Sequence, residues 1–358
     1  MRYSSALACQ RGSRIASPVV IGAGVAGLAT AVELARAGHS PRLLESRPYV
    51  GGRARSFVHA SGDEIDNGQH LLMGCYRATF RLLEMIGTRH LVEIQKRLHV
   101  GFRDADGSAD VLAASRFLPP PLDVIAGMLR LKRLSMGERV ALLRVASEAM
   151  RQACDEHETV ASMLARCGQS RNAQERLWNP MAIATMNTHP DEGSAALFLE
   201  VLRRAFLGKG DDSRLAIPRA GLSELFAPAS DAIVRSGGTV ELSCSVTRIE
   251  KSNGGFIVHA KDRDPITTDN IVVAVPPTQA STLLNGIVAT SFAIETSPIV
   301  SIYMWYDRAL NDIPMMTALI GTSVQWVFNR RRMMNDEVDA TSGLLSCTIS
   351  AAVVESLS

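Results

Sequence analysis

Three glycines near the start of the chain narrow the choice of folds more than any other feature. Gly22, Gly24 and Gly27 directly follow the short apolar run 18–22, and they open an apolar stretch that Gly38 closes. The run predicts a buried parallel strand, and the stretch after it predicts a helix with a glycine C-cap. This spacing is typical of the strand–turn–helix unit that binds a dinucleotide.

Each position in the glycine turn has a physical role. Gly22 permits the tight turn, Gly24 lets the backbone approach a pyrophosphate, and Gly27 lets the helix pack closely on the strand. The pyrophosphate would lie at the helix N-terminus beside Ala23 and Ala26, where N–H groups and the helix dipole favour anions. We therefore expect these five residues to bind the cofactor.

An acidic residue completes the unit. Glu45 ends a second predicted strand, at the distance from the turn that a βαβ unit requires. A carboxylate there accepts hydrogen bonds from ribose hydroxyls, which favours an adenosine with a free 2′-OH over a 2′-phosphate.

A basic, glycine-rich segment follows the acid. It comprises Glu45, Ser46, Arg47, Gly51, Gly52, Arg53 and Arg55. The glycines allow backbone amides to turn toward a cofactor, and Arg53 offers a charged donor to phosphate. The pattern resembles the extension that follows the dinucleotide fold in the flavin amine oxidase and phytoene desaturase superfamily. The resemblance implies FAD as cofactor, with Ser46, Arg47, Gly52 and Arg53 at its site. It also implies that Val246 contacts the adenine through its backbone.

The rest of the chain predicts an α/β protein with two interleaved domains. Residues 120–210 read as mostly helical, residues 239–262 as a β-hairpin turning at 252–255, and residues 271–275 as a buried strand. We expect a Rossmann-like, two-dinucleotide-binding domain and an α+β substrate domain. Their bounds would be 17–90 with 215–290 for the FAD-binding domain, and 91–214 with 291–358 for the substrate domain, after a disordered extension 1–16.

Composition excludes several classes of function. The formal net charge of +2 over 358 residues gives no electrostatic argument for nucleic acid. The six cysteines lie far apart without a CxxC pair, so we expect no metal site and reduced, cytosolic thiols.

A third motif points to a subgroup of the superfamily. It contains Asp66, Asn67, Gly68, Gln69, His70 and, further on, Gly74, Cys75 and Tyr76. Together with the segment 217–226, it resembles the hydroxysqualene dehydroxylases, the flavoenzymes of bacterial hopanoid synthesis. The resemblance covers about residues 18–335 and implies reductive removal of the hydroxyl group of hydroxysqualene, an apolar isoprenoid, to give squalene.

This reaction needs a general acid that helps the hydroxyl group leave as water. The candidates are His70, Asp66 and Tyr76, with Glu192 further along the chain. Asp66 and His70 could instead cap loops or bond to the flavin.

A nearly water-insoluble substrate implies loading from a membrane surface. Residues 117–136 combine apolar spacing with Arg130, Lys132 and Arg133, which predicts an interfacial helix, although an ordinary surface helix gives the same pattern. We expect a cytoplasmic protein, peripheral on the inner face of the cytoplasmic membrane. The sequence does not predict its oligomeric state.

Three alternatives remain open at this point. The chain could be a carotenoid-type desaturase or an amine oxidase of the same fold. It could also be a non-catalytic prenyl-binding protein that resembles escort proteins. Family members close the flavin site with a glycine-rich C-terminal segment, and none is found before Ser358. An inactive fragment that lacks this segment is therefore the third alternative.

Overall fold

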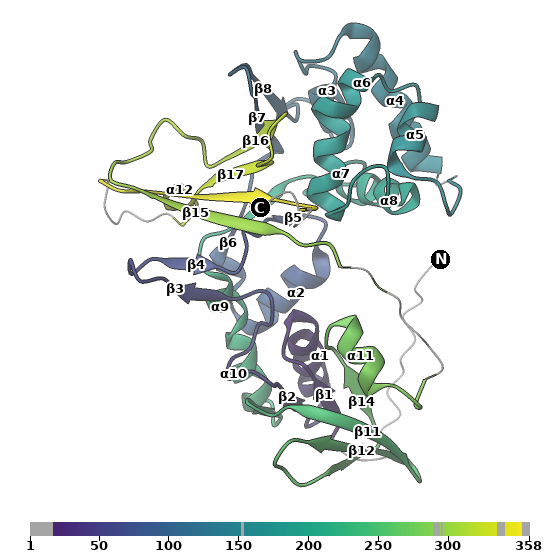
Figure 1. The fold of residues 1–358 in the computed structure, drawn as a ribbon, viewed down its shortest axis with the longest axis vertical. Coiled ribbons are helices and arrows are strands. Elements are labelled where there is room, and N and C mark those ends of the chain that lie inside the picture. The colour runs from purple at the N-terminus through teal and green to yellow at the C-terminus, as the bar shows by residue number, and fades with distance from the viewer. Residues whose placement is uncertain (1–16, 152–153, 289–293, 295, 335–340, 353–358) are drawn as a thin grey trace. The chain divides into compact units, whose positions relative to one another are not determined.

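The computed structural model describes residues 17–151, 154–288, 294, 296–334 and 341–352, which form two compact units (Figure 1). Unit 1 contains the described residues up to Arg53 and those of Phe226–Ile294, and unit 2 contains all the others. Each unit thus consists of two segments that alternate along the chain. The predicted α/β fold is confirmed. The expected disordered extension 1–16 lies outside the described residues.

A parallel four-stranded sheet organises unit 1, in the order β10-β2-β1-β14. Its elements are β1 (Val19–Ile21), α1 (Val25–Arg36), β2 (Arg42–Leu44), α10 (Pro228–Arg235), β10 (Thr239–Glu241), β14 (Ile271–Val273) and α11 (Pro277–Leu283). Strand β1 is completely buried, as a parallel strand with a near-continuous apolar run should be. The first three elements are the predicted βαβ unit.

An antiparallel sheet adds to unit 1. It consists of β11 (Val246–Ser252), β12 (Gly255–Ala260) and β13 (Ile266–Thr268). Ser252 pairs with Gly255 across a two-residue turn in which Gly254 has a φ of +94°, a conformation that glycine adopts without strain. The predicted hairpin turn is therefore confirmed.

Unit 2 contains three sheets. The largest has the order β15-β18-β17-β16-β7-β8, the second pairs β3 with β4, and the third has the order β5-β9-β6. The strands are β3 (Ser56–Val58), β4 (Glu64–Asp66), β5 (Leu72–Met73), β6 (Val92–Ile94), β7 (His99–Asp104), β8 (Ala109–Ala113), β9 (Leu215–Pro218), β15 (Val300–Tyr306), β16 (Met316–Ile320), β17 (Trp326–Asn329) and β18 (Gly343–Ile349).

The predicted helical region is the second layer of unit 2. Its helices are α3 (Leu122–Met128), α4 (Met136–Arg151), α5 (Val160–Arg166), α6 (Arg171–Ala173), the π-helical turn η2 (Gln174–Trp178), α7 (Asn179–Met186) and α8 (Ala195–Ala205). Unit 2 further contains α2 (Arg77–Ile86), the 3₁₀ turn η1 (Arg89–Leu91) and α12 (Arg330–Met333), and α9 (Leu222–Phe226) ends at its border with unit 1. Side-chain oxygens of Thr159, Ser170 and Ser194 cap α5, α6 and α8. Buried residues of the helices and of the large sheet form one core, with Phe198 and Leu164 at the centre.

The compact units divide the chain at other residues than the predicted domains do. Residues 54–90 and 215–225 belong to unit 2, whereas the sequence placed them in the FAD-binding domain. The physical reason is strand pairing, because β9 pairs with both β5 and β6 and so ties these segments to the second unit. The functional division into domains stays a prediction.

Candidate functional site

The glycine turn between β1 and α1 leaves no room for side chains. Gly22 has a φ of +99°, and a Cβ atom there would lie 2.7 Å from the carbonyl oxygen of Ala274. A Cβ atom on Gly27 would lie 1.8 Å from the carbonyl oxygen of Gly22. Both positions therefore require glycine, as the motif predicts.

Gly24 is different, because its surroundings are open. No heavy atom lies within 4 Å of the Cβ that a side chain would add. Gly24 is the N-cap of α1, no side chain caps this helix, and its first turn holds no acid. Within the described residues the positive end of α1 is thus left to an anion from outside the chain. Ala23 is buried below this end, whereas Ala26 is exposed on it.

The second glycine pair lies against the first turn. The N–H of Gly51 donates to the carbonyl oxygen of Ala23 over 2.8 Å, and Gly51 forms a β-bridge with Gly24. Gly52 has a φ of +60°, and a Cβ on it would lie 3.0 Å from Cα of Gly24. The structure therefore brings the two predicted glycine segments together in unit 1.

Glu45 is buried beside the same turn, with 8% of its surface exposed. Its Oε2 accepts a hydrogen bond from the N–H of Ala23 over 2.7 Å, and its Oε1 accepts from the N–H of Arg47 over 2.8 Å. The hydroxyl of Ser46 also donates to Oε1, over 3.1 Å. Because a carboxylate has about four acceptor positions, one remains for a ribose hydroxyl.

The backbone of residues 243–244 is bonded to the segment of Glu45. The backbone N–H of Cys244 donates to the carbonyl oxygen of Glu45, and that of Ser243 donates to the carbonyl oxygen of Arg47. This stretch leads directly into Val246, the first residue of β11. The side chains of Ser46, Arg47 and Arg53 are exposed. The open helix end, the glycine turn and the remaining acceptor position of Glu45 together fit an adenine dinucleotide.

The candidate acids all lie in unit 2, and Asp66 is the most enclosed of them. Its Oδ1 accepts from the hydroxyl of Ser56 over 2.7 Å and from the N–H of Leu222 over 3.0 Å. Its Oδ2 accepts from Nη1 of Arg330 over 2.9 Å. Both oxygens are engaged by the protein, so this geometry favours a structural role over proton donation.

His70 is exposed and directed by its own loop. Its Nδ1 lies 2.7 Å from the carbonyl oxygen of Gly68. A carbonyl oxygen only accepts, so Nδ1 carries a hydrogen and Nε2 is the atom that takes up or releases a proton. This arrangement suits a general acid.

Tyr76 and Glu192 are less suited than His70 to donate a proton. Tyr76 is the N-cap residue of α2, and burial raises the pKa of its phenol above the usual value of 10.0, so the phenol stays protonated at neutral pH. Glu192 is exposed in the turn between α7 and α8. Of the four candidates, His70 is the one whose orientation best suits proton donation.

Arg330 holds the segment that carries His70, and it was not among the residues predicted for the site. This arginine is 2% exposed, and its Nη1 donates both to Asp66 and to Oε1 of Gln69, over 3.0 Å. The hydroxyl of Tyr303 donates to the carbonyl oxygen of Asp66 over 2.7 Å. Arg330 belongs to a run of three arginines, a pattern that normally predicts exposure, so no sequence signal would have found it.

The prediction of one interfacial helix over residues 117–136 is wrong, because the helix is shorter. Residues 122–128 form the short helix α3, and α4 begins only at Met136. The three prolines at 119–121 precede α3 and cannot lie in a helix interior. Helix α4 then begins with a capping box in which Ser135 and Glu138 bond each other's backbone N–H.

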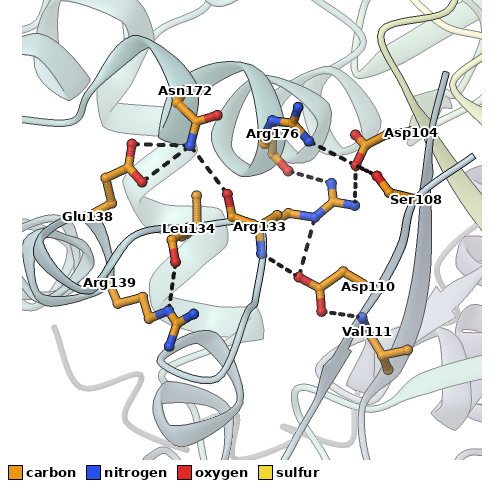
Figure 2. Close-up of polar contacts among 10 residues, drawn as sticks. All are labelled: Asp104, Ser108, Asp110, Val111, Arg133, Leu134, Glu138, Arg139, Asn172 and Arg176. Carbon is orange, nitrogen blue, oxygen red and sulfur yellow. Dashed lines mark hydrogen bonds and ion pairs between the residues drawn. The ribbon is translucent and has the colours of Figure 1, made fainter. Parts of the chain in front are cut away.

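Arg133, predicted to face a membrane, is instead buried, with 2% of its side chain exposed (Figure 2). Its Nη2 lies 3.2 Å from Oδ2 of Asp104, and its backbone N–H donates to Asp110 over 3.0 Å. Arg176 binds the same oxygen of Asp104 over 2.8 Å. Arg133 therefore joins the large sheet to the helical layer and is removed from the predicted membrane contact.

No described helix is long and apolar enough to cross a membrane. The described residues also hold no group of His, Cys, Asp or Glu side chains that could bind a metal ion.

Comparisons with known proteins identify the family of the chain. The profile of the family described as flavin containing amine oxidoreductase matches residues 25–357. The chain is 30% identical to hydroxysqualene dehydroxylase of Rhodopseudomonas palustris, over 86% of this chain and 72% of that protein. It is 28% identical to zeta-carotene desaturase of Zea mays, over 71% of this chain and 48% of that protein.

A solved structure shows the same fold. An oxidoreductase from Methanosarcina mazei matches with a TM-score of 0.73 and 17% identity, over 95% of this chain and 80% of that one. The cofactor that the family implies is FAD, as predicted. The chain belongs to the family of flavin-containing amine oxidoreductases.

Proposed function

We propose that the protein removes the hydroxyl group of hydroxysqualene reductively and releases squalene. The observation that carries the proposal is the similarity to hydroxysqualene dehydroxylase, which extends over 72% of that relative, compared with 48% of the carotene desaturase. The exposed His70, with a defined proton-exchanging nitrogen, supplies the acid that such a reaction needs.

The proposed reaction balances as follows. Protonation of the hydroxyl breaks the C–O bond and releases water, which leaves an allylic cation, and a hydride then forms the new C–H bond. Reduced FAD supplies that hydride when bound. Nε2 of His70 donates the proton, and the carbonyl oxygen of Gly68 holds Nδ1 so that Nε2 is presented.

The cofactor residues have a separate task in this proposal. The N-terminus of α1 at Gly24 binds the pyrophosphate, and Glu45 accepts the ribose hydroxyl. Gly52, Arg53 and Val246 complete the contacts. Asp66 and Arg330 hold the segment of His70 in place.

A hydrocarbon substrate also implies a membrane surface as its source. We expect the protein to take hydroxysqualene from the inner face of the cytoplasmic membrane, where it would be peripheral.

Product analysis tests the proposal. The FAD-loaded protein is reduced without oxygen and offered hydroxysqualene. In separate reactions, protein with oxidised FAD and an added electron acceptor is offered phytoene or a primary amine, and all reactions are run in detergent. We expect squalene from hydroxysqualene, detected by mass spectrometry, and no product from the other two. Desaturation of phytoene or oxidation of the amine would replace the proposal by one of those activities. A protein that shows no flavin absorbance after incubation with FAD would support the non-catalytic prenyl-binding alternative.

A further inference from the structure

Helix α4 (Met136–Arg151) is apolar on two opposite faces. Leu142, Val145 and Ala149 are buried in the core of unit 2, which gives the inward face expected of a surface helix. The outward face of such a helix normally carries charged and polar residues. The outward face of α4 does not follow this rule.

Four large apolar side chains lie on the outward face. Met136, Val140, Leu143 and Met150 have 74%, 59%, 43% and 65% of their surface exposed. Their spacing of four, seven and fourteen residues from the first places them in one stripe along the helix. A contiguous exposed apolar stripe on a soluble protein marks an interaction surface, whereas single exposed side chains do not.

The exposed charges of the segment that contains α4 have one sign. Between residues 116 and 151, the exposed charged side chains are Arg116, Arg130, Lys132, Arg144 and Arg151, all of them basic. The acidic side chains of this segment are buried or already bonded within the protein. Asp123 is buried, and Glu138 accepts hydrogen bonds from Ser135 and Asn172. Glu148 forms an ion pair with Arg166. Arg144 and Arg151 lie beside the stripe on α4 itself, as their spacing on the helix requires.

We propose that the outward face of α4 docks onto a bilayer that contains anionic phospholipid. The stripe enters the interface between headgroups and acyl chains, and the flanking arginines bind the phosphates. A second copy of the chain is a poorer occupant, because it would bring the same basic side chains together. The inference rests on the proposed function only in its expectation of a membrane-borne substrate, and its evidence is the surface itself.

Vesicle sedimentation with the FAD-loaded protein tests the apolar part. Met136, Val140, Leu143 and Met150 are all changed to Gln, which suits an exposed helix. The matched control is Val234→Gln on α10, where the side chain is 56% exposed. We expect the quadruple variant to bind vesicles of phosphatidylcholine and phosphatidylglycerol at least about tenfold more weakly than the wild type. The control should bind like the wild type. Unchanged binding by the quadruple variant would overturn the proposal.

Charge reversal tests the electrostatic part. Arg144→Glu with Arg151→Glu is compared with Lys96→Glu plus Lys251→Glu, a pair of exposed lysines outside α4 that gives the same change of net charge. We expect at least about a tenfold loss for the α4 pair and a small loss for the control. Equal losses would show that net charge alone attracts the protein and would overturn the assignment to α4.

Two further outcomes are decisive. A stronger loss of binding from Phe117→Gln with Leu122→Gln than from the α4 variant would show that docking occurs at the N-terminal end of α3 and would overturn the assignment to α4. A wild-type oligomer that the quadruple variant turns into a monomer, with vesicle binding kept, would show that a second copy occupies the stripe. Failure of the proposed function can be distinguished from failure of the docking proposal, because turnover of hydroxysqualene is measured in detergent, without vesicles.

Discussion

Arg330 and Asp66 form a buried ion pair in unit 2, with Nη1 of the arginine 2.9 Å from Oδ2 of the aspartate and side-chain exposures of 3% and 4%. The two residues are 264 positions apart in the chain. Nε and Nη2 of Arg330 are buried without a hydrogen-bond partner among the described residues. The pair is therefore costly to form and more costly to break on one side.

Removing one partner should destabilise the protein strongly. We expect Arg330→Gln to lower the free energy of unfolding by about 3–5 kcal/mol, because it leaves the carboxylate of Asp66 buried without its counter-charge. Urea unfolding measures the change. The double variant Asp66→Asn with Arg330→Gln should recover part of the loss, and a double variant as unstable as the sum of both single changes would contradict the pairing.

Two glycines of the dinucleotide turn should respond differently to alanine. Gly27→Ala would place a methyl group 1.8 Å from a carbonyl oxygen, so we expect a loss of at least about 3 kcal/mol of stability. Gly24→Ala meets no protein atom within 4 Å and should keep the stability of the wild type, but its methyl group would fill the space at the end of α1. A flavin titration should therefore show weakened FAD binding by this stable variant. Full FAD affinity would argue against Gly24 as the pyrophosphate position.

His70 has a matched control elsewhere in unit 2. Both His70 and His90 are exposed, and both direct Nδ1 at the carbonyl oxygen of a nearby glycine, over 2.7 and 3.0 Å. If His70 donates the proton, His70→Gln should lower kcat for hydroxysqualene about 100-fold to 10,000-fold. His90→Gln should leave it unchanged. Equal rates for the two variants, measured by squalene release, would transfer the role to Tyr76.

The lowered pKa of Glu138 predicts that the stability of the protein depends on pH. Hydrogen bonds, above all from Ser170, lower the pKa of this carboxyl from 4.5 to about 2 in the folded protein. A lowered pKa stabilises the fold above pH 4.5, and the contribution disappears as the pH falls from 4.5 toward 2. The difference in Tm between wild type and Glu138→Gln should therefore shrink across this range, as thermal unfolding would show. Ser170→Ala should reduce the same difference, and a difference that grows in acid would contradict the assignment.

Local features of the fold were predictable from sequence, and long-range pairings were not. The β1–α1–β2 unit was predicted because Gly22, Gly27 and Gly38 mark its turns, and each of these signals lies within a few residues of the structure that it determines. The partner of Asp66 comes from the far end of the chain, and nothing near Arg330 indicates burial.

The prediction that Arg133 faces a membrane was wrong for the same reason. Its sequence neighbours suggest an amphipathic surface segment, but its fate depends on Asp104 and Asp110, which belong to the β7–β8 hairpin. A pattern shows that a residue is charged, and only the fold shows whether a counter-charge lies beside it. The membrane hypothesis therefore moves from this segment to α4.

The shared oxygen of Asp104 also has a consequence for how the protein comes apart. Oδ2 receives Ser108 from the hairpin, Arg133 from the segment before α4 and Arg176 from the π-helical turn (Figure 2). The helices can open away from the sheet only by releasing two arginines from one acceptor. Amide protons of the hairpin and of α4 to α7 should therefore exchange with solvent as one cooperative group, so that the sheet and helices of unit 2 melt in a single step.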